Sequence, residues 1–103
     1  RPIAIDFLDL LAGSECEIEE FELSNDISLF ETAKKRSLSE LGIGKKSGAK
    51  ILAIKENEKL FTNPGGNFIL QPGQVLIAFG GKEQLNILNG LLGNLVVAVE
   101  LLK

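Results

Sequence analysis

Residues 63–80 read NPGGNFILQPGQVLIAFG, and this stretch decides the path of the chain. The Asn-Pro-Gly-Gly of residues 63–66 is incompatible with regular structure and predicts a turn. The Gln-Pro-Gly-Gln of residues 71–74 fits a type II turn, with proline at the second position and glycine at the third. Residues 75–79 (VLIAF) are all apolar and include β-branched and aromatic side chains, which predicts a buried strand that ends at the glycines 80–81. This stretch has two turns that fix the backbone and carries no catalytic side chain. It therefore indicates a domain that acts through its shape and not through chemistry.

Upstream of this stretch, residues 49–55 (AKILAIK) have apolar side chains on both faces and predict a central strand. Asn57-Glu58 then suits a two-residue hairpin, with residues 60–62 as the return strand. Ser37 and Glu40 match a capping box, and Gly42 is a natural stop, so a short helix is expected at residues 38–41.

The first strand is predicted over residues 15–24, where the apolar residues change phase. Cys16 and Ile18 fall on one face, while Phe21 and Leu23 fall on the other. A bulge near residues 19–20 would restore a single buried face. Residues 25–36 are expected to form a loop that carries a basic run.

After the opening stretch, residues 82–92 predict a helix whose leucines share one side. Residues 95–99 contain three valines and favour a strand, with a continued helix as the alternative. Residues 2–11 also look helical, and their apolar face is wide enough to indicate contact with another domain or a second copy. The chain has no methionine, even at position 1, so we interpret it as part of a longer protein.

Composition excludes several function classes. The 103 residues include no histidine and a single cysteine, Cys16, so the commonest acid–base and zinc arrangements are absent. The net charge of -3 argues against a nucleic-acid binder. No apolar run approaches the roughly 18 residues of a membrane helix. We therefore expect no enzyme, no catalytic residue, no metal site, no nucleic-acid partner and no direct membrane insertion.

The chain resembles the TrkA C-terminal domain, the C-lobe of the regulator of conductance of potassium. The resemblance spans about residues 15–92 and rests on five segments: SLSELGI at 37–43, GAKILAI at 48–54, NPG at 63–65, LQPGQVLI at 70–77 and residues 80–85. The chain departs from the family in its longer loop 25–36, in Asn57-Glu58 where Asn-Gly is common, and in its tail after Leu92. We expect an α+β fold with a mostly antiparallel sheet of about four to five strands and two flanking helices.

The resemblance implies a division into three parts. Residues 1–13 would be a linker helix from a preceding nucleotide-binding lobe, residues 14–92 the regulatory domain, and residues 93–103 a C-terminal extension. It also implies a cytoplasmic regulatory domain of a potassium channel or uptake system, which forms a homodimer and couples ligand or partner binding to gating. The alternatives are an insert of an anion or dicarboxylate transporter, or a dimerisation module with no small-molecule ligand.

Some family members bind cyclic di-AMP near the end of the short helix and the start of the next strand. There the family pattern places an arginine where this chain has Gly44, and the neighbouring lysines lack its bidentate geometry. Two solvated loop lysines are the favoured interpretation, with cyclic di-AMP or another small anion as the alternative. The candidate ligand-binding residues are Ile43, Lys45, Lys46, Lys50, Ile51, Asn63 and Pro64. The candidate dimer-interface residues are Phe7, Leu8, Leu11, Ile51 and Ile54.

Overall fold

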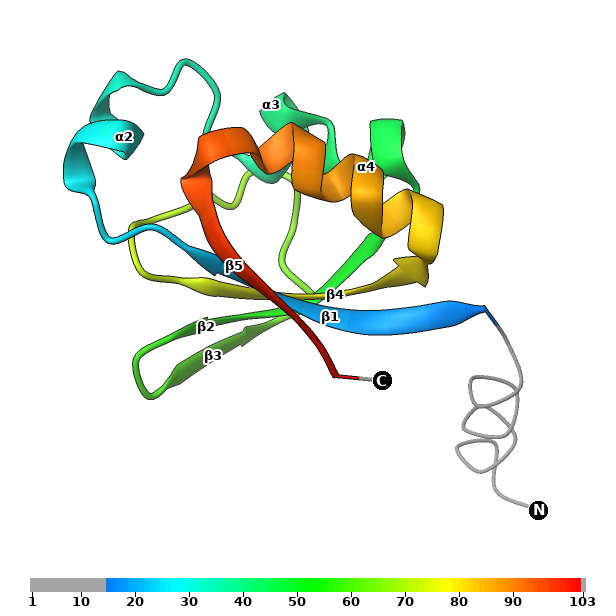
Figure 1. Cartoon of the computed structure of the whole chain (residues 1–103). Helices are drawn as coiled ribbons and strands as arrows, with labels where there is room; N and C mark the ends of the chain where they lie inside the picture. The colour runs from blue at the N-terminus through cyan, green and yellow to red at the C-terminus, as the bar shows by residue number, and fades with distance from the viewer. Residues whose placement is uncertain (1–14, 103) are drawn as a thin grey trace.

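Five strands form one antiparallel sheet in the order β3-β2-β4-β1-β5, and the helices lie on one face of it (Figure 1). The computed structural model describes residues 15–102. The strands are β1 (Cys16–Leu23), β2 (Lys50–Glu56), β3 (Lys59–Thr62), β4 (Val75–Gly81) and β5 (Val96–Leu101). The helices are α2 (Ile27–Thr32), α3 (Leu38–Leu41) and α4 (Lys82–Leu92), with a π-helical turn at Ile43–Ser47 and a 3₁₀ turn at Gly93–Leu95. The predicted α+β class with a mostly antiparallel sheet is confirmed.

The Pro-Gly turn at residues 71–74 and the hairpin at Asn57 direct the chain as predicted. Gly73 has a φ of 79°, and the backbone N–H of Gln74 donates to the carbonyl of Gln71 at 3.3 Å, as a type II turn requires. The β2–β3 hairpin closes between Glu56 and Lys59. Its Asn57 takes the positive φ of 55°, a conformation that asparagine tolerates better than most residues.

The strand β1 has no bulge near residues 19–20, so that prediction was wrong. Its register with β4 is continuous from Cys16 opposite Gly81 to Glu22 opposite Val75. The apolar phase changes because the two faces of the sheet both carry apolar residues. Ile18 lies opposite Phe79 on the helix-free face, whereas Phe21 lies opposite Leu76 on the face that the helices cover. The register shift occurs against β5 instead, between Glu22 and Leu23.

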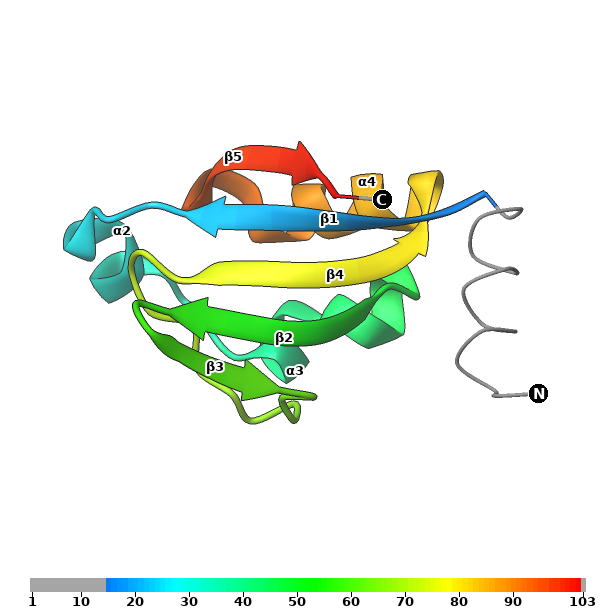
Figure 2. The same ribbon diagram turned by 90° about the horizontal axis from the view of Figure 1, so that it is seen from below.

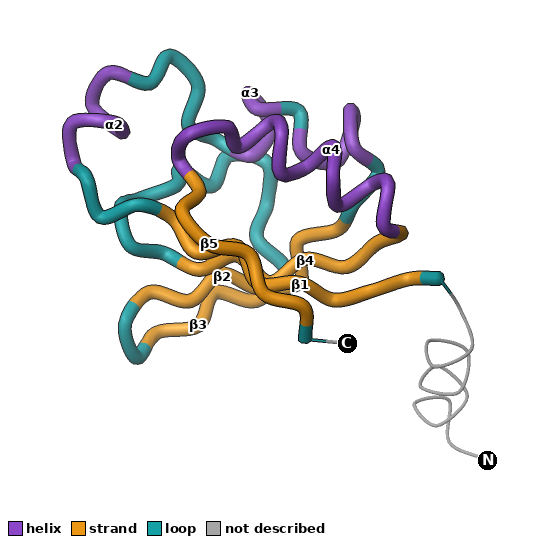
Figure 3. The backbone as a smooth tube through the Cα atoms, viewed as in Figure 1, coloured by secondary structure: helices purple, strands orange, loops and turns teal. Residues whose placement is uncertain are grey.

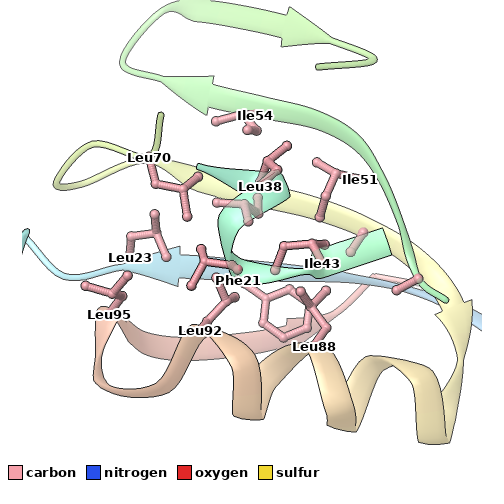
Figure 4. Close-up of a cluster of buried hydrophobic side chains, with 14 of the residues drawn as sticks. Phe21, Leu23, Leu38, Ile43, Ile51, Ile54, Leu70, Leu88, Leu92 and Leu95 are labelled. Atoms are coloured by element: carbon pink, nitrogen blue, oxygen red, sulfur yellow. The ribbon is translucent and has the colours of Figure 1, made fainter. Parts of the chain in front are cut away.

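The core fills the space between the sheet and the helices. Figure 4 shows Leu88 and Leu92 of α4 facing Phe21 and Leu23 of β1. All four of these side chains are buried, and Leu38 and Ile43 extend the same cluster toward β2. Burial of this continuous cluster is the main driving force that holds the helices on the sheet.

The helix α2 replaces part of the loop predicted over residues 25–36. Its N-cap is Asp26, whose side chain accepts from the backbone N–H of Ser28 at 3.0 Å. Phe30 is 1% exposed and anchors the helix, and the Arg36 guanidinium lies 5.8 Å from the centre of its ring. Because α2 has only one buried residue among six, it shows no helical repeat of apolar residues from which the sequence could have predicted it.

The C-terminal tail pairs with β1 as the strand β5, which confirms the preferred prediction over a continued helix. The strand β4 ends at Gly81, as the glycines 80–81 predicted. Figure 3 shows the helices gathered on one side of the five strands, and Figure 2 shows the opposite face of the sheet. The predicted linker helix 1–13, with Phe7, Leu8 and Leu11, lies outside the described residues.

Candidate functional site

A hollow of about 310 Å³ lies where α3, the π-helical turn, the start of β2 and the loop after β3 meet. It is lined by Leu38, Ser39, Gly42, Ile43, Gly44, Lys45, Ala49, Lys50, Ile51, Pro64 and Gly66. Its volume lies at the lower end of the range for small-molecule pockets, which is roughly 300–1,000 Å³.

The first wall of the hollow, α3, is fixed by a capping box. The Ser37 hydroxyl accepts from the backbone N–H of Glu40 at 3.0 Å, and the Glu40 carboxylate accepts from the backbone N–H of Ser37 at 3.1 Å. This backbone hydrogen bond from Ser37 is the main reason that the pKa of Glu40 lies below its usual value. The helix then ends at Gly42, whose φ of 72° is the left-handed conformation that glycine adopts without strain.

The loop after β3 forms the second wall and is hydrogen-bonded to the first. The backbone N–H of Ser39 donates to the carbonyl of Gly66 at 2.8 Å, and that of Leu38 donates to the carbonyl of Phe68 at 3.1 Å. These two donors belong to the first turn of α3, where intrahelical partners are absent. The loop therefore accepts the hydrogen bonds that the first turn of α3 cannot make within the helix, and these bonds hold the two walls together.

The π-helical turn brings Ile43 and Lys45 to the hollow. Gly48 ends the turn with a φ of 80° and donates from its backbone N–H to the carbonyl of Gly44 at 2.9 Å. The Ser47 hydroxyl is hydrogen-bonded to the carbonyl of Ile43 and accepts from the backbone N–H of Ala49 at 3.0 Å. These bonds hold the short connection between α3 and β2 in one conformation.

The hollow is apolar at its base and positively charged at its rim. The side chains of Leu38, Ile43, Ala49 and Ile51 are all buried and form the apolar base. Lys45 and Lys50 are exposed, and no carboxylate occurs among the lining residues. Such a surface suits a ligand that combines an apolar or aromatic group with an anionic group.

The sequence profile of the TrkA-C domain matches residues 33–93, more than half of the chain. The chain belongs to the TrkA-C domain family. It is 33% identical over 85 residues to potassium channel protein 1 of Methanocaldococcus jannaschii, covering 82% of this chain and 25% of that protein. It is 34% identical over 98 residues to probable potassium channel protein 2 of the same organism, covering 88% and 27%. The chain thus spans about a quarter of the length of these curated relatives.

A solved structure gives the TrkA-C domain a structural counterpart. The chain superposes with a TM-score of 0.66 and 27% identity on the RCK C domain of the potassium transport protein KtrA, in complex with cyclic diadenosine monophosphate. The match covers 85% of this chain and 94% of that one. The fold of the described residues is therefore that of an RCK C domain.

The hollow of this TrkA-C domain contains five of the seven residues that the sequence proposed for a ligand: Ile43, Lys45, Lys50, Ile51 and Pro64. Lys46 and Asn63 are not among the lining residues. The side-chain carbons of Lys46 lie against Gly42, 2.8–3.1 Å from where a Cβ would stand. Asn63 has a φ of 47° and donates from its backbone N–H to the carbonyl of Leu52 at 2.9 Å, so it shapes the loop.

Sequence reasoning missed six of the eleven lining residues, and Ser39 and Gly66 are the two that join α3 to the loop after β3. The capping box could have indicated Ser39, because it fixes the first residue of α3 and therefore which side of this helix faces the loop. Nothing in the sequence pairs Gly66 with Ser39, because their contact joins segments 27 residues apart.

The structure corrects the interface role proposed for Ile54. Its side chain is 0% exposed and belongs to the core, so it offers no surface to a second copy. A regular strand would place Ile51 and Ile54 on opposite faces, and the sequence proposed both for a dimer interface. In the structure a register shift of β2 against β4, between Ile51 and Ala53, puts both side chains on the helix-covered face. Ile51 lies opposite Ala78, and Ile54 lies opposite Leu76. Ile51 is 5% exposed and lines the hollow.

A second hollow, of about 890 Å³, lies at the junction of β4 and α4 and is lined mostly by polar and charged residues. Glu15, Glu17 and Glu83 line it together with Lys82. Partial burial, and then the charge of Glu17, raise the pKa of nearby Glu19.

Residues 15–102 contain no group of three or more acidic, cysteine or histidine side chains placed to hold a metal ion. Within the same residues, no helix is long and apolar enough to cross a membrane.

Proposed function

We propose that this TrkA-C domain is a regulatory domain of a potassium channel or potassium uptake system, and that it binds a small anionic ligand in the hollow beside α3. The similarity to the potassium channel proteins of M. jannaschii, at 33% and 34% identity, supports a potassium channel as the host protein. The KtrA domain in complex with cyclic diadenosine monophosphate supports the ligand class. The observation that carries the proposal is the lysine-rimmed apolar hollow without a carboxylate.

The chemistry of the hollow matches a nucleotide-like ligand. An aromatic base lies against the buried apolar side chains of Ile43 and Ile51, and a phosphate lies between the ammonium groups of Lys45 and Lys50. Gly44 stands between Ile43 and Lys45 and provides no guanidinium. Lysine acts on a phosphate as a point charge and not as a fork, so the affinity depends strongly on salt.

The size of the hollow favours a site shared by two copies of the domain. One copy supplies about 310 Å³, whereas cyclic di-AMP has two equal nucleotide halves. A twofold-symmetric ligand fits two facing hollows related by a twofold axis. The homodimer is therefore part of this proposal, with Ile51 and the π-helical turn near the seam.

Binding would regulate the host by shifting a conformational equilibrium. A ligand that contacts one arrangement of two domains better than another favours that arrangement by its difference in affinity. Neither the hollow nor this scheme needs a chemical step, so we assign no catalytic role. The domain would act on the cytoplasmic side of the membrane, next to the rest of the channel or transporter.

A thermal-shift panel tests this proposal. The ligands are cyclic di-AMP, cyclic AMP, ATP and inorganic phosphate, each against the wild type and Lys34→Ala, in which an exposed lysine outside the hollow is removed. A ligand at 100 times its Kd stabilises the folded state by about 2.7 kcal/mol. For a domain of this size that corresponds to a rise in Tm of roughly 10 °C. No shift with any of the four ligands, in buffers of low and high salt, would contradict the proposal.

A further inference from the structure

The outer edge of β5 is a second candidate binding surface, separate from the ligand hollow. In the sheet order, β5 is terminal, and only β1 pairs with it among the described residues. It lies at the opposite edge from β3, the strand that leads into the ligand hollow. Figure 2 shows β5 at one margin of the sheet and β3 at the other.

The register assigns the backbone groups of Val99 and Leu101 to this free edge. The backbone N–H of Leu102 donates to the carbonyl of Ile18 at 2.7 Å, so residue 102 points toward β1. Hydrogen-bonding direction alternates along an antiparallel strand, and Glu100 lies opposite Glu20 in regular register. The N–H and C=O groups of Val99 and Leu101 therefore point outward.

The side chains along the edge are divided between the two faces. Val99 lies opposite Phe21, so Val99 and Leu101 lie on the helix-covered face, where they are 44% and 57% exposed. Glu100 lies opposite Glu20 on the other face of the sheet. Glu22, two residues along β1 from Glu20, lies on that same face. Both Glu22 and Glu100 are exposed, and Glu20 is paired with Lys55 at 3.4 Å. The edge strand is thus apolar on the helix-covered face, where Glu19 of β1 lies opposite Leu101, and acidic on the other face.

We propose that this edge binds an extended peptide segment in which apolar residues alternate with lysine or arginine. Such a segment adds a sixth strand to the sheet: its backbone pairs with Val99 and Leu101, its apolar side chains lie beside theirs, and a cation lies opposite Glu100. The strand β5 contains no proline or lysine, the residues that commonly block an edge.

A second copy of the domain fits the edge less well. Antiparallel self-pairing of the outward groups, with Val99 opposite the Leu101 of a second copy, places Glu100 directly opposite its own counterpart. Two carboxylates facing each other across strands oppose pairing. A basic segment replaces this repulsion by attraction, so charge complementarity favours the basic strand over this pairing with a second copy.

Peptide binding followed by amide hydrogen exchange tests the proposal. The probes are acetylated, amidated Lys-Val-Lys-Val-Lys and Glu-Val-Glu-Val-Glu peptides, added to the full chain at low salt. The basic peptide should slow amide exchange at Val99 and Leu101 at least tenfold, and the acidic peptide should not. Glu100→Lys should reverse this preference. Glu58→Lys, the same charge change in the β2–β3 hairpin, should leave it unchanged.

Three results would overturn the proposal: no protection at either amide, protection by both peptides alike in the wild type, or the same preference in Glu100→Lys. Protection that depends on protein concentration in the absence of peptide would also overturn it, because a second copy would then occupy the edge. Thermal stability of each variant, measured alone, shows that the fold is retained. Binding of cyclic di-AMP to Glu100→Lys keeps this test separate from the ligand site.

Discussion

The backbone N–H of Ser39 donates a hydrogen bond of 2.8 Å to the carbonyl oxygen of Gly66. This bond joins the first turn of α3 to the loop after β3, and both residues line the candidate ligand hollow. A Cβ added at Gly66 would lie 3.2 Å from the Cβ of Ser39, closer than side chains normally approach. The shape of the hollow therefore depends on a glycine at this position.

Gly66→Val should destabilise the domain and weaken ligand binding. The added methyl groups meet Ser39, and both positions are exposed, so the loss of stability should be about 1 kcal/mol. Chemical unfolding measures the loss, and titration with cyclic di-AMP measures the change in affinity. The matched control is Gly65→Val, because a Cβ at Gly65 has no neighbour within 4 Å. Equal effects of the two substitutions would contradict the contact.

Gly73→Ala should destabilise the domain by about 1–2 kcal/mol, the cost of left-handed backbone in a residue with a Cβ. Gly73 has a φ of 79°, and its added Cβ would lie 2.5 Å from the Oδ1 atom of Asn25. Thermal and urea unfolding check the loss. Gly65→Ala lacks both features and should change stability by less than about 0.5 kcal/mol. A neutral Gly73→Ala would show that the type II turn does not constrain the fold.

The stability that Glu40 contributes should disappear in acid. Backbone hydrogen bonds, first from Ser37 and then from Arg36, lower the pKa of Glu40 below its usual value of 4.5. A lowered folded-state pKa stabilises the fold above the usual value, and this stability is lost as the pH falls through the folded pKa. The difference in unfolding free energy between wild type and Glu40→Gln should be largest near neutral pH.

Urea unfolding of both proteins between about pH 7 and pH 3 measures this difference. Asp26 also has a lowered pKa, from its hydrogen bonds with Ser28, but it is present in both proteins and cancels. A difference that stays constant across the range would mean that the carboxylate charge of Glu40 does not contribute.

Local signals sufficed for most of the fold. The capping box of Ser37, the type II turn at Gly73 and the Asn57 hairpin each depend on residues within four positions of one another, so the sequence alone identifies them. The resemblance to the TrkA-C domain rests on the order of these elements and led to the expected antiparallel sheet with flanking helices. It also placed the candidate ligand residues around the end of α3, where the structure has a hollow.

Features that depend on long-range packing could not be predicted. The phase change in β1 was interpreted as a bulge because Ile18 has apolar neighbours, such as Phe79, on the helix-free face only after the sheet has formed. Ile54 was assigned to a partner because the register shift within β2, which turns Ile54 toward the helices, arises only when β2 pairs with β4. The direction of the Lys46 side chain over Gly42 likewise depends on the conformation of the π-helical turn.

The central claim is that Lys45 and Lys50 hold an anionic ligand over the apolar hollow. Isothermal titration calorimetry of cyclic di-AMP into the wild type, Lys45→Ala/Lys50→Ala and Lys34→Ala tests it most directly. Each lost charge-assisted contact should cost about 1.5 kcal/mol or more, so the double variant should bind roughly a hundredfold more weakly. Lys34→Ala should match the wild type within about twofold. Wild-type affinity in the double variant, or no binding by the wild type, would contradict the account.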